Sequence, residues 1–122
     1  MKFTINKASY CDGTNVECLT SSSYWEGSPS WSPDGKKIAF QSSREGNDCI
    51  YAMNADGTNV RRLTDGIPPD KQPSWSPDGT HIAYASFAGE SFEIFAMGAD
   101  GSNKTNEFVP SLEVWVQISP EI

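Results

Sequence analysis

The sequence predicts an all-β protein built from antiparallel sheets of four strands that recur along the chain. Three observations lead to this prediction: a repeat of 44 residues, turn motifs at fixed places in it, and short apolar runs between the turns. The segment Trp31–Gly35, Trp-Ser-Pro-Asp-Gly, returns unchanged 44 residues later as Trp75–Gly79. The motif Asp-Gly-Thr/Ser-Asn begins at Asp12, Asp56 and Asp100, at the same spacing. A repeat this regular indicates that each copy is one supersecondary unit packed on the next.

Each copy is expected to contain four short strands. In the first full copy, one strand ends at Trp31 and the others cover 37–42, 49–54 and 60–64. The middle strands carry consecutive apolar residues, as in Ile38-Ala39-Phe40, instead of strict alternation. We therefore expect both faces of each sheet to be covered.

Two turn motifs join these strands. In Ser32–Gly35, proline suits the first central position of a type I turn, aspartate the second, and glycine the left-handed position that follows. Asp56-Gly57 is expected to join the third and fourth strands. The tryptophans end the first strands, where an aromatic ring fills the space between adjacent sheets. The residues assigned to these structural positions are Trp31, Pro33, Asp34, Gly35, Asp56 and Gly57 in the first full copy, and Trp75, Pro77, Asp78, Gly79, Asp100 and Gly101 in the second.

Four-stranded sheets of about 40 to 45 residues that stack face to face are the blades of a β-propeller. The predicted fold class is therefore an all-β partial β-propeller of four-stranded antiparallel blades, with two full blades and a partial blade at each end. The predicted boundaries are 1–26 for a partial blade (third and fourth strands), 27–70 and 71–110 for full blades, and 111–122 for the first strand of a further blade. An open arc of this kind leaves an apolar face and unpaired strand edges at each end.

The same motifs carry a family resemblance. The sequence resembles the WD-like propeller repeat of the TolB family in four stretches. These are Pro-Ser-Trp-Ser-Pro-Asp-Gly with the following Ile-Ala-Phe, and residues 42–47, 50–57 and 62–64. The repeat is similar to that of the propeller domains of prolyl-oligopeptidase-type peptidases as well. The resemblance covers residues 27–103 closely and 6–20 more loosely. It implies a ring of about six blades, of which this chain supplies fewer than three.

The resemblance also implies a function. A TolB-like role is non-catalytic protein binding or scaffolding in the cell envelope, periplasmic or extracellular, with peptidoglycan-associated lipoproteins among the expected partners. Two alternatives stay open: the propeller part of a prolyl-oligopeptidase-like serine peptidase without its catalytic domain, and a free-standing arc that self-associates through its open blade edges into a closed ring. Residues 1–20 contain no apolar core of a secretory signal, which leaves a cytoplasmic location open.

Composition and motifs exclude several classes of function. The formal net charge of −7, without a Lys/Arg cluster, argues against nucleic acid as a partner, and no stretch is long enough to insert in a membrane. No Gly-x-Ser-x-Gly motif is present, and His81 falls at a variable surface position. The Asp56 loop lacks the carboxylates of an EF-hand, and Cys11, Cys18 and Cys49 lack zinc-site spacing. We therefore expect no enzyme activity, no cofactor and no metal.

A partner surface is predicted where the repeats differ from one another. The segment 43–48 between the second and third strands becomes 87–92 in the next copy, and the connection 65–72 should open on the same side. Arg44 is expected either to bind an acidic group of a partner or to pair with Glu45, Asp48 or a neighbouring blade. The two phenylalanines of 87–92 are expected to form either a contact anchor or a lid over the blade gap. The candidate partner-binding residues are Arg44, Glu45, Asn47, Asp48, Asp70, Lys71, Phe87, Glu90 and Phe92.

Overall fold

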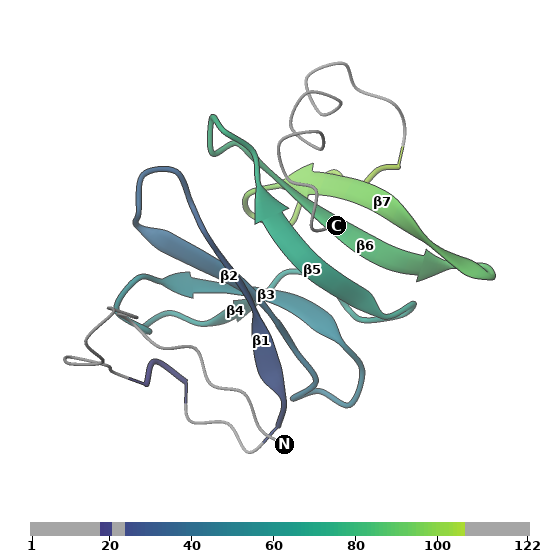
Figure 1. Cartoon of the computed structure of the whole chain (residues 1–122), viewed down its shortest axis with the longest axis horizontal. Helices are drawn as coiled ribbons and strands as arrows, with labels where there is room; N and C mark the ends of the chain where they lie inside the picture. Colours follow the sequence, from purple (N-terminus) through teal and green to yellow (C-terminus); the bar gives the residue numbers. More distant parts are fainter. Residues whose placement is uncertain (1–17, 21–23, 107–122) are drawn as a thin grey trace, which may run out of the picture.

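The computed structural model describes residues 18–20 and 24–106 as two antiparallel sheets (Figure 1). The first sheet has the order β1-β2-β3-β4 and the second the order β5-β6-β7, so each sheet follows the chain. The predicted all-β fold of antiparallel blades is confirmed. The strands are β1 (Glu26–Trp31), β2 (Lys37–Ser42), β3 (Cys49–Asn54), β4 (Arg61–Arg62), β5 (Asp70–Trp75), β6 (His81–Ala88) and β7 (Ser91–Gly98).

The fourth strands are shorter than the sequence predicts. β4 pairs with β3 only at Arg61 and Arg62. The ladder ends there because the Ile50 N–H of β3, which would bond to the next residue of β4, donates to the Thr64 hydroxyl (2.9 Å) instead of a backbone carbonyl. In the second sheet, the described part of the expected fourth strand is a single bridge between Ala96 and Thr105. The strands expected before Cys18 and after 110 lie outside the described residues, so the blade boundaries remain a prediction.

The β6–β7 hairpin is longer than its counterpart in the first sheet. Phe87 pairs with Phe92 and Ala88 with Ser91, which leaves a turn of only two residues. The expectation that 87–92 forms a loop is therefore wrong: both phenylalanines lie in strands. In the first sheet, the β2–β3 pairing already ends at Ser42 and Cys49.

The Ser-Pro-Asp-Gly turns are held by their own side chains. The Ser32 hydroxyl and the Lys36 N–H donate to Asp34 Oδ1 at 2.6 and 3.0 Å, and Gly35 has a φ of +73°. Asp78 accepts the equivalent bonds from Ser76 and Thr80, and these bonds lower its pKa to about 2. Both aspartates are thus used to close a hairpin.

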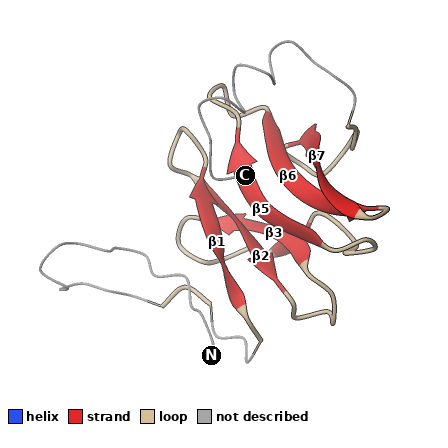
Figure 2. Ribbon diagram, turned by 45° about the vertical axis from the view of Figure 1, so that its right-hand side comes forward, coloured by secondary structure: helices blue, strands red, loops and turns tan. Residues whose placement is uncertain are grey.

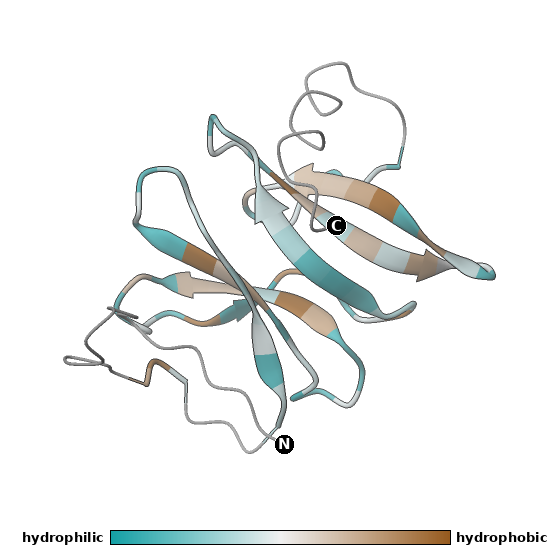
Figure 3. Cartoon of the chain, in the orientation of Figure 1, coloured by the Kyte–Doolittle hydropathy of each residue, from teal (hydrophilic) through white to brown (hydrophobic). Residues whose placement is uncertain are grey.

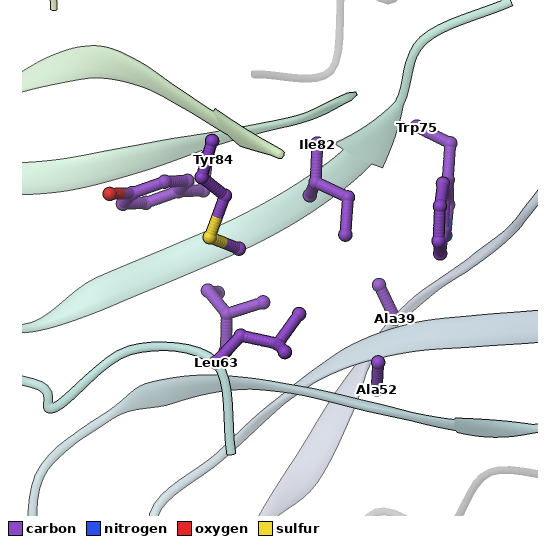
Figure 4. Close-up of a cluster of buried hydrophobic side chains, with 8 residues drawn as sticks. Ala39, Ala52, Leu63, Trp75, Ile82 and Tyr84 are labelled. Atoms are coloured by element: carbon purple, nitrogen blue, oxygen red, sulfur yellow. The ribbon is translucent and has the colours of Figure 1, made fainter. Parts of the chain in front are cut away.

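The sheets pack face to face, and β5 lies beside the first three strands of the other sheet (Figure 2). β1 and β5 are largely polar, whereas β3 and β7 carry more apolar residues (Figure 3). The shared core joins residues of β2, β3 and Leu63 to residues of β5, β6 and β7 (Figure 4). Its buried members are Ala39, Ile50, Ala52, Leu63, Trp75, Ile82, Tyr84 and Met97.

The two repeated tryptophans have different surroundings. Trp75 is 9% exposed, and its Nε1 donates to the Ser30 carbonyl of the first sheet at 3.0 Å. Trp31 is 47% exposed. The strands predicted to pack beside it lie outside the described residues, so its role between sheets stays a prediction.

A glycine fixes how closely one sheet approaches the next. A Cβ on Gly101 would lie 3.1 Å from the carbonyl oxygen of Leu63 in the first sheet. One repeat earlier, a Cβ on Gly57 would lie 3.0 Å from the carbonyl oxygen of Leu19. At both described Asp-Gly turns, the glycine therefore packs against the leucine of the repeat before it.

We expect Gly101→Ala to lower the free energy of unfolding by about 2–4 kcal/mol, because it combines a strained positive φ with a clash against the neighbouring sheet. Gly35→Ala is the matched control: its φ is also positive, but nothing lies within 4 Å of the added Cβ. That substitution should cost only about 1 kcal/mol. Urea unfolding followed by tryptophan fluorescence measures both, and equal losses would contradict the proposed tight contact.

Candidate functional site

Three segments meet at the end of the sheets where the tip of the β6–β7 hairpin lies, at the right of Figure 1. The Asp70 N–H donates to the Asp48 carbonyl at 2.9 Å, which ties β5 to the β2–β3 loop. The Phe87 N–H donates to the Pro69 carbonyl at 3.1 Å, which ties the hairpin to the connection between the sheets. Lys71 Nζ lies 3.8 Å from Asp48 Oδ2. We call Asp48, Lys71, Phe87 and Phe92 the rim cluster.

The aromatic pair of the rim cluster is exposed but held in place. The rings of Phe87 and Phe92 meet edge to face, with centroids 5.1 Å apart, and are 38% and 47% exposed. Lys71 Nζ lies 5.5 Å from the Phe92 ring centroid, so the lysine links Asp48 of the first sheet to Phe92 of the second. An exposed aromatic pair beside a charge pair is suited to contact with another protein, because aromatic residues are common interface anchors.

Arg44 has a partner that the sequence interpretation did not name. Its guanidinium donates to Glu26 Oε2 through both Nε, at 3.0 Å, and Nη2, and its central carbon lies 5.0 Å from the Tyr51 ring centroid. Glu26 is fully buried and also accepts from Ser42 at 3.1 Å. Neither Glu45 nor Asp48 pairs with this arginine in the bonds described. The repeat held a signal for it, since an acid stands at Glu26 and again 44 residues later.

Asp70 is also placed differently from the prediction. The sequence predicts it in the connection between the blades, but it is the first residue of β5 and is 4% exposed. The hydroxyls of Ser86 and Thr64 and the Gly66 N–H donate to its carboxylate. Burial raises the pKa of Asp70, with a smaller contribution from the nearby charge of Asp65. This carboxylate therefore connects both sheets from the inside.

A pocket of about 500 Å³ opens between the two sheets beside Asp70. The second sheet contributes Tyr84, Ser86 and Phe95 to the wall of this pocket. The first sheet and the connection between the sheets contribute the other residues of the wall, both polar and apolar. We call it the intersheet pocket. Its lining residues are Arg62, Leu63, Thr64, Asp65, Ile67, Pro68, Asp70, Tyr84, Ser86, Phe95 and Lys104.

The other predicted partner residues are exposed in the same loops. Glu45 and Asn47 lie in the β2–β3 loop, and Glu90 lies in the turn of the β6–β7 hairpin. The structure thus brings Glu45, Asn47, Glu90 and the rim cluster to one end of the sheets. Their role in binding remains a prediction.

The described residues offer little for catalysis or metal binding. Within 18–20 and 24–106, no three His, Cys, Asp or Glu side chains could together hold a metal ion. His81 is exposed, and its Nδ1 lies 2.8 Å from the Thr80 hydroxyl. Cys18 and Cys49 are free thiols, and burial raises the pKa of Cys49. No helix in the described part is long and apolar enough to span a membrane.

Comparison with known families matches residues 9–120 to the TolB beta propeller domain. The chain belongs to the TolB β-propeller family. This agrees with the antiparallel sheets, the Ser-Pro-Asp-Gly turns and the 44-residue spacing. No curated protein matches the sequence significantly.

Solved structures of TolB proteins share the fold. The putative TolB of Agrobacterium tumefaciens is 30% identical with a TM-score of 0.72, over 80% of this chain and 38% of that chain. TolB of Acinetobacter baumannii is 31% identical with a TM-score of 0.66, over 79% of this chain and 24% of that chain. A puromycin hydrolase is similar in fold, with 20% identity and a TM-score of 0.61, over 78% of this chain and 16% of that chain. The chain thus spans well under half of the TolB structures that it resembles.

The raised pKa of Asp70 gives this TolB propeller segment a specific pH dependence. Because the folded-state pKa lies above the unfolded value, the Asp70 contribution to stability is largest at low pH and falls as pH rises through the folded pKa. We expect wild type to lose stability relative to Asp70→Asn between pH 4 and pH 7. Denaturant unfolding of both proteins at the two pH values measures this difference, and a difference that stays constant with pH would contradict it.

Proposed function

We propose that this chain is a non-catalytic protein-binding module of the cell envelope and that its rim cluster contacts the partner. The observation that carries the proposal is the exposed pair Phe87 and Phe92, which the β6–β7 ladder holds edge to face beside the Lys71–Asp48 ion pair. Aromatic side chains at rigid positions lose little entropy on binding, so they make efficient anchors. Membership in the TolB propeller family supports the assignment to the envelope, with peptidoglycan-associated lipoproteins as the expected class of partner.

The chemistry of the described residues supports binding rather than catalysis. The turn aspartates Asp34, Asp78 and Asp100 all accept hydrogen bonds from their own turns, which lowers their pKa values. Of the four described aspartates whose pKa is shifted, only Asp70 has a raised pKa, and its carboxylate has three donors. The peptidase alternative gains no specific support, since similarity to the puromycin hydrolase at 20% identity concerns the fold alone.

Truncation of the aromatic anchor tests the proposal. We expect Phe92→Ser to weaken binding to the purified peptidoglycan-associated lipoprotein of the same organism about tenfold or more, as loss of an interface anchor does. Val60→Ser is the matched control, because Val60 is also an exposed apolar residue but precedes β4 at the opposite end of the sheets. Biolayer interferometry with both variants measures the dissociation constants. Equal affinities for wild type and Phe92→Ser would exclude the rim cluster as the contact.

A second candidate function is self-association of the arc. The observation that favours it is a row of exposed apolar residues on one face of the β6–β7 hairpin, formed by Phe87, Phe92 and Ile94. Residues two apart on a strand share a face, so this face is continuous. An uncovered apolar face of a sheet favours association between chains.

Light scattering on the purified chain tests self-association. If the face binds a second copy, wild type forms an oligomer and Ile94→Asp shifts it to monomer, because the substitution places a charge in an apolar contact. A well-folded wild-type monomer at tens of micromolar would rule out the self-associating arc.

A further inference from the structure

The first sheet holds its own arginine in a slot built from an acid, a serine and two stacked aromatic rings. Arg44 donates to Glu26 and lies above Tyr51 and Phe40, with its central carbon 5.0 and 5.8 Å from the two ring centroids. The rings are stacked, with centroids 5.6 Å apart. Ser42, which pairs with Glu26 in the sheet, donates to the same carboxylate oxygen as Arg44. The guanidinium thus has both an ionic and a stacking partner.

The second sheet repeats this slot without the arginine. Asp70 and Ser86 pair as Glu26 and Ser42 do, and the Ser86 hydroxyl donates to the Asp70 carboxylate. Tyr84 and Phe95 form the stacked pair, with centroids 5.9 Å apart. At the position 44 residues after the arginine stands Ala88. The acid, the serine and the ring pair are kept, and the guanidinium is missing.

The intersheet pocket lies at this place. Its lining includes all four kept residues, which correspond one by one to the residues around Arg44. Asp65 adds a second carboxylate to the lining. The Asp70 side chain is one methylene shorter than that of Glu26 in the first sheet. Its carboxylate therefore reaches less far into the pocket and leaves more room for a ligand. The pocket therefore combines buried negative charge with an aromatic wall.

We propose that the intersheet pocket binds a guanidinium group that comes from outside the chain, in the position that Arg44 fills in the first sheet. The planar cation stacks on Tyr84 and Phe95 while its N–H groups donate to Asp70 and Ser86. A charge-assisted bond to a buried carboxylate is stronger than a neutral one, so the positive charge is required. The site is separate from the rim cluster and does not depend on the proposed function.

Two cations of the chain also line the pocket. Lys104 Nζ donates to the Gly101 carbonyl, which holds the ammonium group at that carbonyl. Arg62 is exposed and contributes to the pocket lining from the first sheet. Substitution of Arg62 is therefore included among the variants that test the site.

The probe for the test is N-acetyl-arginine amide, with N-acetyl-citrulline amide as a matched control of nearly the same shape but without charge. We expect the arginine probe to bind in the roughly millimolar range, as one small contact allows, and to shift the amide NMR signals of Asp70, Tyr84 and Ser86. The citrulline probe should bind at least tenfold more weakly. Equal affinity of the two probes, or shifts centred elsewhere, would overturn the proposal.

Three variants locate the site. Asp70→Asn should weaken arginine binding about tenfold, and Ala88→Arg should abolish it by supplying the group within the chain, with NMR spectra confirming that both variants are folded. Phe92→Ser should leave it unchanged, which separates this site from the rim cluster. Arg62→Gln should change affinity less than threefold. If Arg62→Gln binds the arginine probe markedly more tightly than wild type, Arg62 itself occupies the pocket and the proposal is refuted. If Asp70→Asn binds the probe as tightly as wild type, the carboxylate does not bind the guanidinium and the proposal is refuted as well.

Free arginine distinguishes the two sources of a guanidinium group. Binding of the blocked probe more tightly than free arginine supports an arginine side chain of a partner protein. Tighter binding of free arginine supports a small guanidinium compound. Both outcomes support a guanidinium site. If neither the blocked arginine probe nor free arginine binds at concentrations from about 20-fold below its solubility limit up to that limit, the proposal is refuted.

Discussion

The packing of one sheet on the next is the constraint on which the other features of this chain depend. Each sheet is too small to bury its apolar residues alone, so residues of β2 and β3 share a core with Trp75, Ile82 and Met97. The approach is fixed by specific contacts: Trp75 donates to Ser30, the Gln72 N–H donates to the Gln41 side chain, and a glycine turn packs against a leucine carbonyl. The last of these contacts occurs twice in the described residues, at Gly57 and at Gly101, because the repeat has a constant length.

The same packing creates both candidate sites. When the sheets are held in this register, their variable loops converge at one end, and Lys71 reaches Asp48 across the interface while its ammonium also lies near Phe92. The intersheet pocket lies in the same interface, lined by Asp70, Ser86, Tyr84 and Phe95, while Ala88 stands where the repeat places Arg44 in the first sheet. Both candidate sites therefore lie where the copies differ, since the shared positions are used to form the sheets.

The fold was accessible from the sequence because its signals are local. Turn chemistry in Ser-Pro-Asp-Gly, apolar runs in β2 and β3, and a constant spacing each indicate structure within a few residues. The burial of Asp70 and the pairing of Arg44 with Glu26 were not accessible in this way, because they depend on which strands lie side by side and how far side chains reach across them. Likewise, the turn of the β6–β7 hairpin has only two residues, Gly89 and Glu90, because Ala88 pairs with Ser91. The identities of the two turn residues alone do not specify this pairing.

Alignment of the repeats with the structure in hand recovers part of what local reasoning misses. Glu26 and Asp70 are both acids at equivalent positions, and in both sheets a serine donates to the carboxylate and a stacked aromatic pair lies nearby. Where four of five interacting residues are kept and the fifth is replaced, the physical requirements of the four persist: a buried carboxylate still favours a positive charge, and a stacked ring face still favours a planar cation. In a repeat protein, a missing member of a repeated contact is therefore evidence for a binding site, because the first copy shows which chemical group completes the second.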